Sequence, residues 1–375
     1  MTVAGTGAIL LLTTNPGLAD VVVGELRERL AGAGLADPAV TRLDEPVRGR
    51  VRVQVPASEA EVLPAAWRLR TVHHILRPLT WMRLDRMDDP APMAELAARV
   101  EVPELTPDTP FRVTAERSGH HAFGSHDIQR VVGAAVQRHF GAPVSLTEHA
   151  VDLRVDVVET YVRVSRQLTD RPLSMRHPMV YRQRVALRAT VAHAAVRLGA
   201  HGLDRPPARI ADPFCGTGTL LLEAGSVYPA AELLGADRTA RAAEGARANL
   251  DAAGMAGRAR VERFDARELA DHWPEASLDL VLSNPPYGRR MGREIPFERF
   301  YGDLMAQLRR VVRPGGRVAI LVDRRARFLR AVHRVGGFGI PHRRALRTSG
   351  TYPTLVVLER HWDGSTRGVS SASGI

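Results

Sequence analysis

From residue 206 onward, short apolar segments alternate with helical ones, and this alternation restricts the fold of the chain more than any other feature. Five segments have the composition of buried strands: residues 210–214, 233–236, 260–264, 278–283 and 318–322. Three segments between them have the apolar spacing of amphipathic helices: residues 220–227, 240–253 and 297–312. A late strand is predicted over residues 355–358. The alternation predicts an α/β domain over residues 206–361, built on a parallel, doubly wound sheet.

The first 170 residues predict two smaller α+β units instead. In residues 1–85, strands are predicted at 8–13 and 47–55, and helices at 18–30 and 67–76, the latter stopped by Pro78. In residues 86–170, a strand at 111–116 and a helix at 127–140 precede one or two strands within 151–164. Residues 171–205 are predicted as a linker with a helix over 181–199, and residues 362–375 as a flexible Gly/Ser-rich tail.

The composition of the chain excludes several kinds of chemistry. The 375 residues predict two or three domains, and all 52 basic residues are arginine. A chain without lysine has no Schiff-base chemistry and no lysine-dependent phosphate loop. One cysteine, Cys215, excludes disulfide scaffolds and four-cysteine zinc sites, and we expect no metal. No apolar run reaches the length of a membrane span, so we expect a cytoplasmic protein with no membrane partner.

Positive charge is concentrated in two parts of the chain. The formal net charge is +11, yet residues 309–347 alone carry 12 arginines against one acid, Asp323. Residues 166–188 carry six arginines against Asp170. Such local excess attracts polyanions, because each phosphate contact releases condensed counterions. The alternative to polyanion binding is compositional: a chain that uses no lysine has arginine at all of these basic positions.

A glycine-rich turn follows the first strand of the α/β domain, at Asp212-Pro213-Phe214-Cys215-Gly216-Thr217-Gly218-Thr219. Gly216 and Gly218 allow close approach of a ligand to the backbone, and the following helix offers free N–H groups. The turn lacks the spacing of a dinucleotide fingerprint, and Asp212 suits a cationic ammonium group better than a pyrophosphate.

Two more acidic residues stand at the ends of the next two predicted strands. Asp237 could accept hydrogen bonds from ribose hydroxyls, and Asp265 from the amino group of an adenine. Each aspartate alone is more often a helix cap or a turn former. Together with Asp212, they predict a pocket for an adenosine that carries a cationic amino acid, which is S-adenosylmethionine.

The fourth predicted strand ends in Ser283-Asn284-Pro285-Pro286-Tyr287-Gly288. Two prolines make a stiff turn without donors, so the Asn284 side-chain oxygen and the Pro285 carbonyl can face one point. Two such acceptors match the hydrogens of a planar amino group, and Tyr287 offers a face on which a base can stack.

These two motifs resemble those of class I S-adenosylmethionine-dependent methyltransferases that act on exocyclic amines. The segment Arg112-Val113-Thr114-Ala115-Glu116-Arg117-Ser118-Gly119, with the helix at 127–140, resembles a THUMP domain, and residues 1–85 resemble the ferredoxin-like segment that precedes it. The whole is similar to the THUMP-containing tRNA guanine-N2-methyltransferases. This resemblance implies a monomeric enzyme with a Rossmann-like C-terminal domain that methylates a guanosine of tRNA in the acceptor stem, at position 6.

The resemblance also implies site residues. The catalytic candidates are Asn284, Pro285, Pro286 and Tyr287. The candidates for binding the cofactor are Asp212, Phe214, Cys215, Gly216, Thr217, Gly218, Thr219, Asp237, Arg238, Asp265, Ala266 and Asn284. The candidates for binding RNA are Arg112, Arg117, His120, Arg130, Arg182 and Arg289.

Two alternatives stay open at this point. The first is the same reaction on ribosomal RNA. The second is a non-catalytic RNA-binding protein with a degenerate methyltransferase fold.

Overall fold

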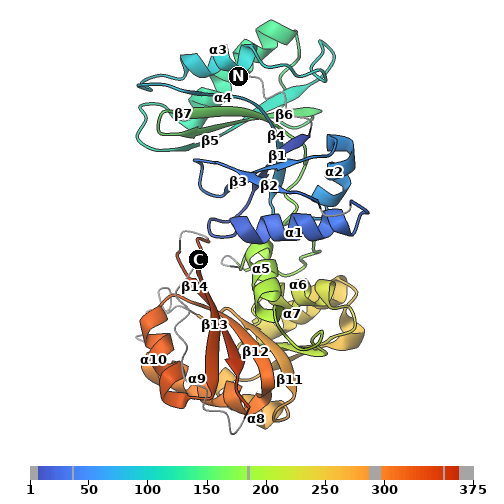
Figure 1. Cartoon of the computed structure of the whole chain (residues 1–375), viewed down its shortest axis with the longest axis vertical. Helices are drawn as coiled ribbons and strands as arrows, with labels where there is room; N and C mark the ends of the chain where they lie inside the picture. The colour runs from blue at the N-terminus through green and yellow to red at the C-terminus, as the bar shows by residue number, and fades with distance from the viewer. Residues whose placement is uncertain (1–6, 36–37, 184–185, 287–296, 349–350, 363–375) are drawn as a thin grey trace. The chain divides into compact units, whose positions relative to one another are not determined.

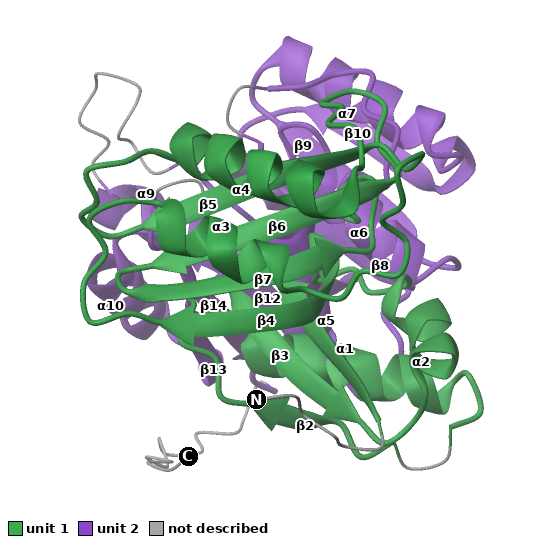
Figure 2. Cartoon of the chain, turned by 90° about the horizontal axis from the view of Figure 1, so that it is seen from above, with its two compact units in different colours: residues 1–14, 19–173 green, residues 15–18, 174–375 purple. Residues whose placement is uncertain are grey.

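The structure is a computed structural model, and it describes residues 7–35, 38–183, 186–286, 297–348 and 351–362. The chain divides into two compact units (Figure 2). Unit 1 comprises Met1–Thr14 and Ala19–Leu173, and unit 2 comprises Asn15–Leu18 and Ser174–Ile375. In the described part of the chain, no helix is both long and apolar enough to cross a membrane.

Unit 1 is built on one mixed sheet of seven strands. Their order across the sheet is β2 (Thr41–Leu43), β3 (Arg50–Val55), β1 (Ala8–Thr13), β4 (His74–Arg83), β7 (Tyr161–Gln167), β6 (Val151–Val158) and β5 (Phe111–Ser118). Neighbouring strands are antiparallel except β5 and β6. The predicted stretch at 151–164 is therefore two strands.

Unit 1 also has four helices among its described residues, labelled in Figure 1, and two apolar cores. The helices are α1 (Ala19–Ala31), α2 (Glu59–Ala66), α3 (Ala91–Ala98) and α4 (Ser125–Phe140). One core combines α1 and α2 with the β1 and β3 side of the sheet, and the other combines α3 and α4 with the side of β5, β6 and β7. Each core buries the apolar faces that its own helices present.

The helix predicted over residues 67–76 is wrong. The helix lies earlier, as α2, with a capping box between Ser58 and Glu61 and a C-cap at Trp67. Pro78 does not stop a helix, since it lies within β4 beside a register shift against β7. The apolar residues Leu69, Val72 and Ile75 have helical spacing, but pairing of β4 with both β1 and β7 overrides it.

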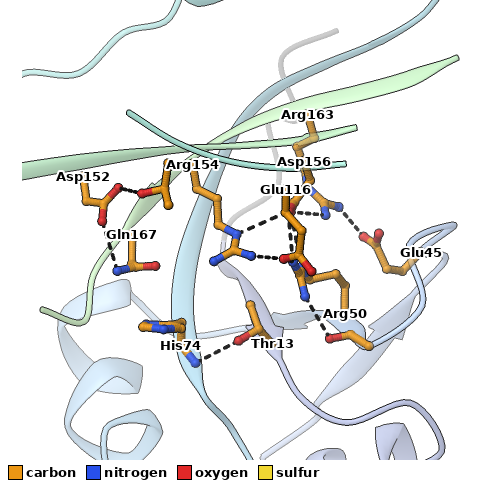
Figure 3. A network of polar contacts seen from close by, with 12 residues as sticks. Thr13, Glu45, Arg50, His74, Glu116, Asp152, Arg154, Asp156, Arg163 and Gln167 are labelled. Atoms are coloured by element: carbon orange, nitrogen blue, oxygen red, sulfur yellow. Dashed lines mark hydrogen bonds and ion pairs between the residues drawn. The ribbon is translucent and has the colours of Figure 1, made fainter. Parts of the chain in front are cut away.

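A network of buried ion pairs joins β3, β6 and β7 in unit 1 (Figure 3). The Asp156 carboxylate accepts from Arg50 at 2.9 Å and from Arg163 at 3.1 Å, while Arg163 also contacts Glu45 at 2.5 Å. Burial alone would raise the pKa of Asp156, but the surrounding arginines, Arg50 first, hold it far below its usual range. The network therefore depends on a permanently charged carboxylate.

Unit 2 is built on a second sheet of seven strands. Their order is β10 (Ala259–Arg263), β9 (Glu232–Asp237), β8 (Arg209–Asp212), β11 (Leu278–Ser283), β12 (Val312–Val322), β14 (Thr354–Arg360) and β13 (Phe338–Ala345). The first five strands are parallel, as predicted. The expectation of a parallel sheet fails at the other edge, where β14 is antiparallel to both β12 and β13.

The helices of unit 2 come between its strands along the chain and lie beside the sheet (Figure 1). They are α5 (Ala189–Ala200), α6 (Thr219–Val227), α7 (Ala240–Ala252), α8 (Leu269–His272), α9 (Phe297–Val311) and α10 (Arg325–Val335), with two 3-10 turns, η1 (Ala256–Arg258) and η2 (Ala266–Glu268). The helix predicted over 181–199 begins only at Ala189, because residues 181–183 lie against α7 instead. The strand predicted over residues 318–322 begins earlier, because β12 starts at Val312, directly after α9.

Candidate active site at the carboxyl edge of the sheet in unit 2

Four of the predicted site residues stand at the carboxyl ends of four adjacent parallel strands. Asp212 ends β8, Asp237 ends β9, Asp265 follows β10 and Asn284 follows β11. Parallel strands that are neighbours in a sheet present their carboxyl ends at the same edge, which is where open α/β sheets bind ligands. The structure therefore places these four residues along one edge.

The glycine-rich turn is tied to the end of β9. The Cys215 N–H donates to the Ala236 carbonyl at 2.8 Å, and the Gly216 N–H donates to the Asp237 carboxylate at 3.3 Å. Gly216 and Gly218 have φ values of +54° and +80°, in the left-handed region that favours glycine. The turn then leads into α6, with Gly218 as its N-cap. At Gly216 and Gly218 the turn therefore presents backbone without side chains, next to the N-terminus of α6.

Asp212 is a buried carboxyl group with one described hydrogen bond, from the Phe214 N–H at 3.0 Å. Burial, opposed by this hydrogen bond and helped by the charge of Asp237, raises the pKa of Asp212 to about 8. A desolvated acid of this kind ionises readily only when a cation comes close.

Asp237 and Asp265 are both partly engaged by the protein itself. One Asp237 oxygen accepts from the Thr239 N–H and hydroxyl, each at 2.9 Å. Asp265 caps η2 through the Arg267 N–H at 3.0 Å and pairs with the Arg267 guanidinium at 2.9 Å. The side-chain hydrogen bond from Arg267 lowers the pKa of Asp265 despite the opposing effect of burial. Asp265 thus stays an anionic acceptor, and it also has the capping role that the sequence left open.

The turn after β11 is described only as far as Pro286. Asn284 is half-buried, Pro285 is buried and Pro286 is exposed. Ser283, the last residue of β11, is buried beside Ile320 of β12. Tyr287 and Arg289 lie outside the described residues, so their predicted roles stay predictions.

The other residues of the predicted cofactor site surround the turn. The Phe214 ring lies 5.9 Å from that of Phe300, and the hydroxyls of Thr217 and Thr219 are 3.0 Å apart. Burial, with the nearby carboxyl groups of Asp212 and Asp237, raises the pKa of the Cys215 thiol, so that it stays protonated and is a poor nucleophile. Ala266 is buried at the start of η2, and Arg238 is exposed after β9.

The predicted RNA-binding residues have different surroundings. Arg112 forms an ion pair with the buried Asp152 at 2.6 Å, and Arg117 donates to the Gly119 carbonyl at 3.3 Å. His120, Arg130 and Arg182 are exposed. Arg112 and Arg117 thus have structural partners, while the other three present their side chains to solvent.

One residue beside the turn, Asn249, was missed from the sequence. Asn249, buried in α7, donates to the Thr217 carbonyl at 2.9 Å and to the Tyr181 carbonyl at 2.8 Å. The available signal was an amide side chain on the apolar stripe of a helix, next to Ala246 and Leu250.

Comparisons with known proteins define the class. The family model "RMKL-like, methyltransferase domain" matches residues 176–347, and the THUMP domain model matches residues 92–166. The chain thus has a methyltransferase domain preceded by a THUMP domain. It is 36% identical over 349 residues to the tRNA (guanine(6)-N2)-methyltransferase of Thermus thermophilus, covering 93% of this chain and 98% of that protein.

Solved structures agree with this relationship. The crystal structure of TrmN from Thermus thermophilus superposes with a TM-score of 0.74 and 34% identity, over 94% of this chain and 99% of that one. A putative methyltransferase, SMU.472, solved with SAH, shares the fold at a TM-score of 0.70 and 18% identity, over 96% of this chain and 99% of that one. The chain belongs to the THUMP-containing RMKL-like methyltransferases. The predicted class I fold is confirmed, and S-adenosylmethionine is the cofactor of this class.

Proposed function

We propose that this protein transfers a methyl group from S-adenosylmethionine to the N2 amine of a guanosine in tRNA, at position 6 of the acceptor stem. The observation that carries the proposal is the Asn284-Pro285-Pro286 turn, which leaves the strand next to the one that ends in Asp212. The Thermus thermophilus relative and a mouse relative, at 27% identity over 241 residues, both bear the name tRNA (guanine(6)-N2)-methyltransferase.

The residues at this edge fit the cofactor. The buried Asp212 carboxyl, with its raised pKa, would hold the cationic amino-acid end. The left-handed Gly216 and Gly218 would leave room for close contact along the turn, and Asp237 would accept from the ribose hydroxyls. The bound cofactor supplies an electrophilic methyl group and a thioether leaving group.

The protein would contribute mainly by positioning the amine. The guanine N2 lone pair is delocalised into the ring, so the nitrogen is a weak nucleophile. The Asn284 oxygen and the Pro285 carbonyl would accept its two hydrogens and direct the lone pair toward the methyl carbon. One of these two hydrogens would leave N2 as a proton to solvent once the nitrogen carries the methyl group. Asn284 is neutral and serves as an acceptor, not as a strong base.

Helix α10 offers a surface for the RNA backbone near this edge. Within residues 309–347, Arg310, Arg313 and Arg317 are paired with carboxylates. In contrast, Arg325, Arg327 and Arg334 are exposed on α10, and the charges of Arg327 and Arg334 act only as secondary influences on Glu298, after Arg330. Because α10 follows β12, the strand beside β11, its first turn starts at the edge that carries Asn284.

The test is transfer of a tritiated methyl group to total RNA, followed by identification of the nucleoside and its position. We expect N2-methylguanosine at position 6 of tRNA, and loss of that nucleoside from tRNA of cells that lack the gene. Label recovered in ribosomal RNA, with unchanged tRNA, would replace the proposed substrate and leave the reaction in place.

A further inference from the structure

The segment that precedes α5, residues 176–183, lies against the glycine-rich turn. Asn249 of α7 connects the two. Its side-chain oxygen accepts from the Tyr181 N–H at 2.8 Å, and its amide donates to the carbonyls of Tyr181 and Thr217. A single buried amide thus bonds to the backbone of the segment and to the backbone of the turn.

Packing of the Tyr181 ring fixes the same segment. A Cβ atom at Gly245 of α7 would lie 2.0 Å from Tyr181 Cδ1, so the ring occupies the space that any other residue would fill. The Arg241 guanidinium lies 5.9 Å from the centre of this ring. The glycine in this helix is therefore required by a close approach and not by helix geometry.

The segment is also fixed at its start and reaches the turn at its end. The fully buried Glu223 of α6 pairs with Arg176 at 2.9 Å and with His177 at 2.8 Å. At the other end, Gln183 Oε1 lies 3.5 Å from the position of a Cβ at Gly216, and Gln183 Nε2 donates to the Tyr181 hydroxyl at 3.1 Å.

We propose that Asn249 is a positioning residue that couples the order of residues 176–183 to cofactor binding at the glycine-rich turn. Because one amide bonds both backbones, displacement of the segment removes support from the Thr217 carbonyl and opens the turn beside Gly216. Conversely, a ligand that fixes the turn stabilises the segment. The inference rests on the proposed binding of the cofactor by this turn.

The experiment compares Gly245→Ala with Gly302→Ala. Both glycines lie within helices, but a Cβ at Gly302 of α9 would meet nothing within 4 Å. Alanine favours a helix, so we expect both helices to stay folded and Gly245→Ala to displace the Tyr181 ring, and melting curves of both variants check that the fold is kept. We expect Gly245→Ala to raise the Kd for S-adenosylhomocysteine about tenfold, measured by calorimetry, and Gly302→Ala to leave it unchanged.

Limited trypsinolysis gives a second readout. The chain has no lysine, so trypsin cleaves only after arginine, and Arg182 is exposed within the segment. Saturating S-adenosylhomocysteine should slow cleavage after Arg182 in the unmodified protein, and much less so in Asn249→Asp and Gly245→Ala. In a Tyr181→Ala background, Gly245→Ala should add no further loss of affinity, because the ring is gone.

The outcomes separate the two proposals. If the unmodified protein does not bind S-adenosylhomocysteine, the proposed function fails. If it binds, but Gly245→Ala shows the same affinity and the same protection of Arg182, the coupling is refuted. Equal weakening by Gly302→Ala would also refute it, since the effect would then not depend on the Tyr181 contact.

Discussion

Asp212 and Asp237 end neighbouring parallel strands, and the negative charge of Asp237 acts on the buried carboxyl group of Asp212. Together with the larger effect of burial, this raises the pKa of Asp212 to about 8. In the absence of a cofactor, Asp212 therefore holds a proton at neutral pH. A cation that binds beside it must displace that proton.

We expect affinity for S-adenosylhomocysteine to increase with pH. Below pH 8 the free protein carries neutral Asp212, whereas the bound cationic amino group favours the carboxylate, so binding releases a proton. The affinity should rise by up to about tenfold per pH unit from pH 6 toward 8 and then level off. Calorimetry in two buffers of different ionisation enthalpy measures the released proton directly. Affinity that is flat between pH 6 and 8 would contradict this assignment.

The same group should make the cofactor-free protein less stable as pH rises. The folded-state pKa of Asp212 lies above its unfolded value of about 3.9, so between these values the folded state binds more protons and stability falls with increasing pH. Asp212→Asn keeps an acceptor for the Phe214 N–H and removes the charge. At pH 8 it should stabilise the protein by about 1 kcal/mol or more, seen as a Tm higher by about 2–4 °C. Near pH 3, roughly one unit below the unfolded pKa, Asp212 is protonated in both the folded and the unfolded state, and the two proteins should melt nearly alike.

Asn284→Ala should reduce turnover far more than it reduces cofactor affinity. Loss of a hydrogen-bonding group that acts mainly in the transition state typically reduces kcat by about 10²–10³. Asn284→Asp retains the acceptor oxygens, so it should keep more activity than the alanine variant. Single-turnover methyl transfer and S-adenosylhomocysteine binding separate the two effects. Near-normal turnover of Asn284→Ala would remove Asn284 from the mechanism.

Asp156→Asn should destabilise unit 1. Arg50 and Arg163 are buried around this carboxylate, and removal of one partner from a buried ion pair costs about 3–5 kcal/mol. Arg86→Gln, in an exposed pair with Asp88, is the control and should cost less than about 1 kcal/mol. Hydrogen exchange of β6 and β7 measures the opening free energy of this unit. Equal protection in the two variants would show that the network contributes little.

How far the sequence predicts the site depends on the range of the interactions. The sequence could place Asp212, Asp237 and Asn284 because each lies at the end of a predicted apolar strand. The alternation of strands and helices predicts a parallel sheet, and the carboxyl ends of its strands lie at one edge. The sequence could not predict the hydrogen bond between Asn249 and Tyr181. It joins positions 68 residues apart, and the backbone at Tyr181 is not helical. The helical spacing of the apolar residues extended the predicted helix back to Tyr181, whose backbone is instead hydrogen-bonded to Asn249 of α7.

Helix α10 shows the same limit and gives a last prediction. The sequence reveals the excess of arginine in residues 309–347, but not which of these side chains are neutralised by partners. We expect the triple variant of Arg325, Arg327 and Arg334 to Gln to bind tRNA more weakly at low salt. The slope of log Kd against log salt should fall by about 2–3, since each lost phosphate contact removes about 0.7–0.9.

The control for this variant replaces three arginines that are paired with carboxylates, Arg209, Arg260 and Arg310, by Gln. It removes the same formal charge from the same unit, so a general effect of net charge would lower both slopes equally. Affinity for S-adenosylhomocysteine should stay constant in both variants, because neither set contacts the glycine-rich turn. A salt slope that falls as much in the control as in the α10 variant would exclude α10 as a specific surface for the RNA backbone.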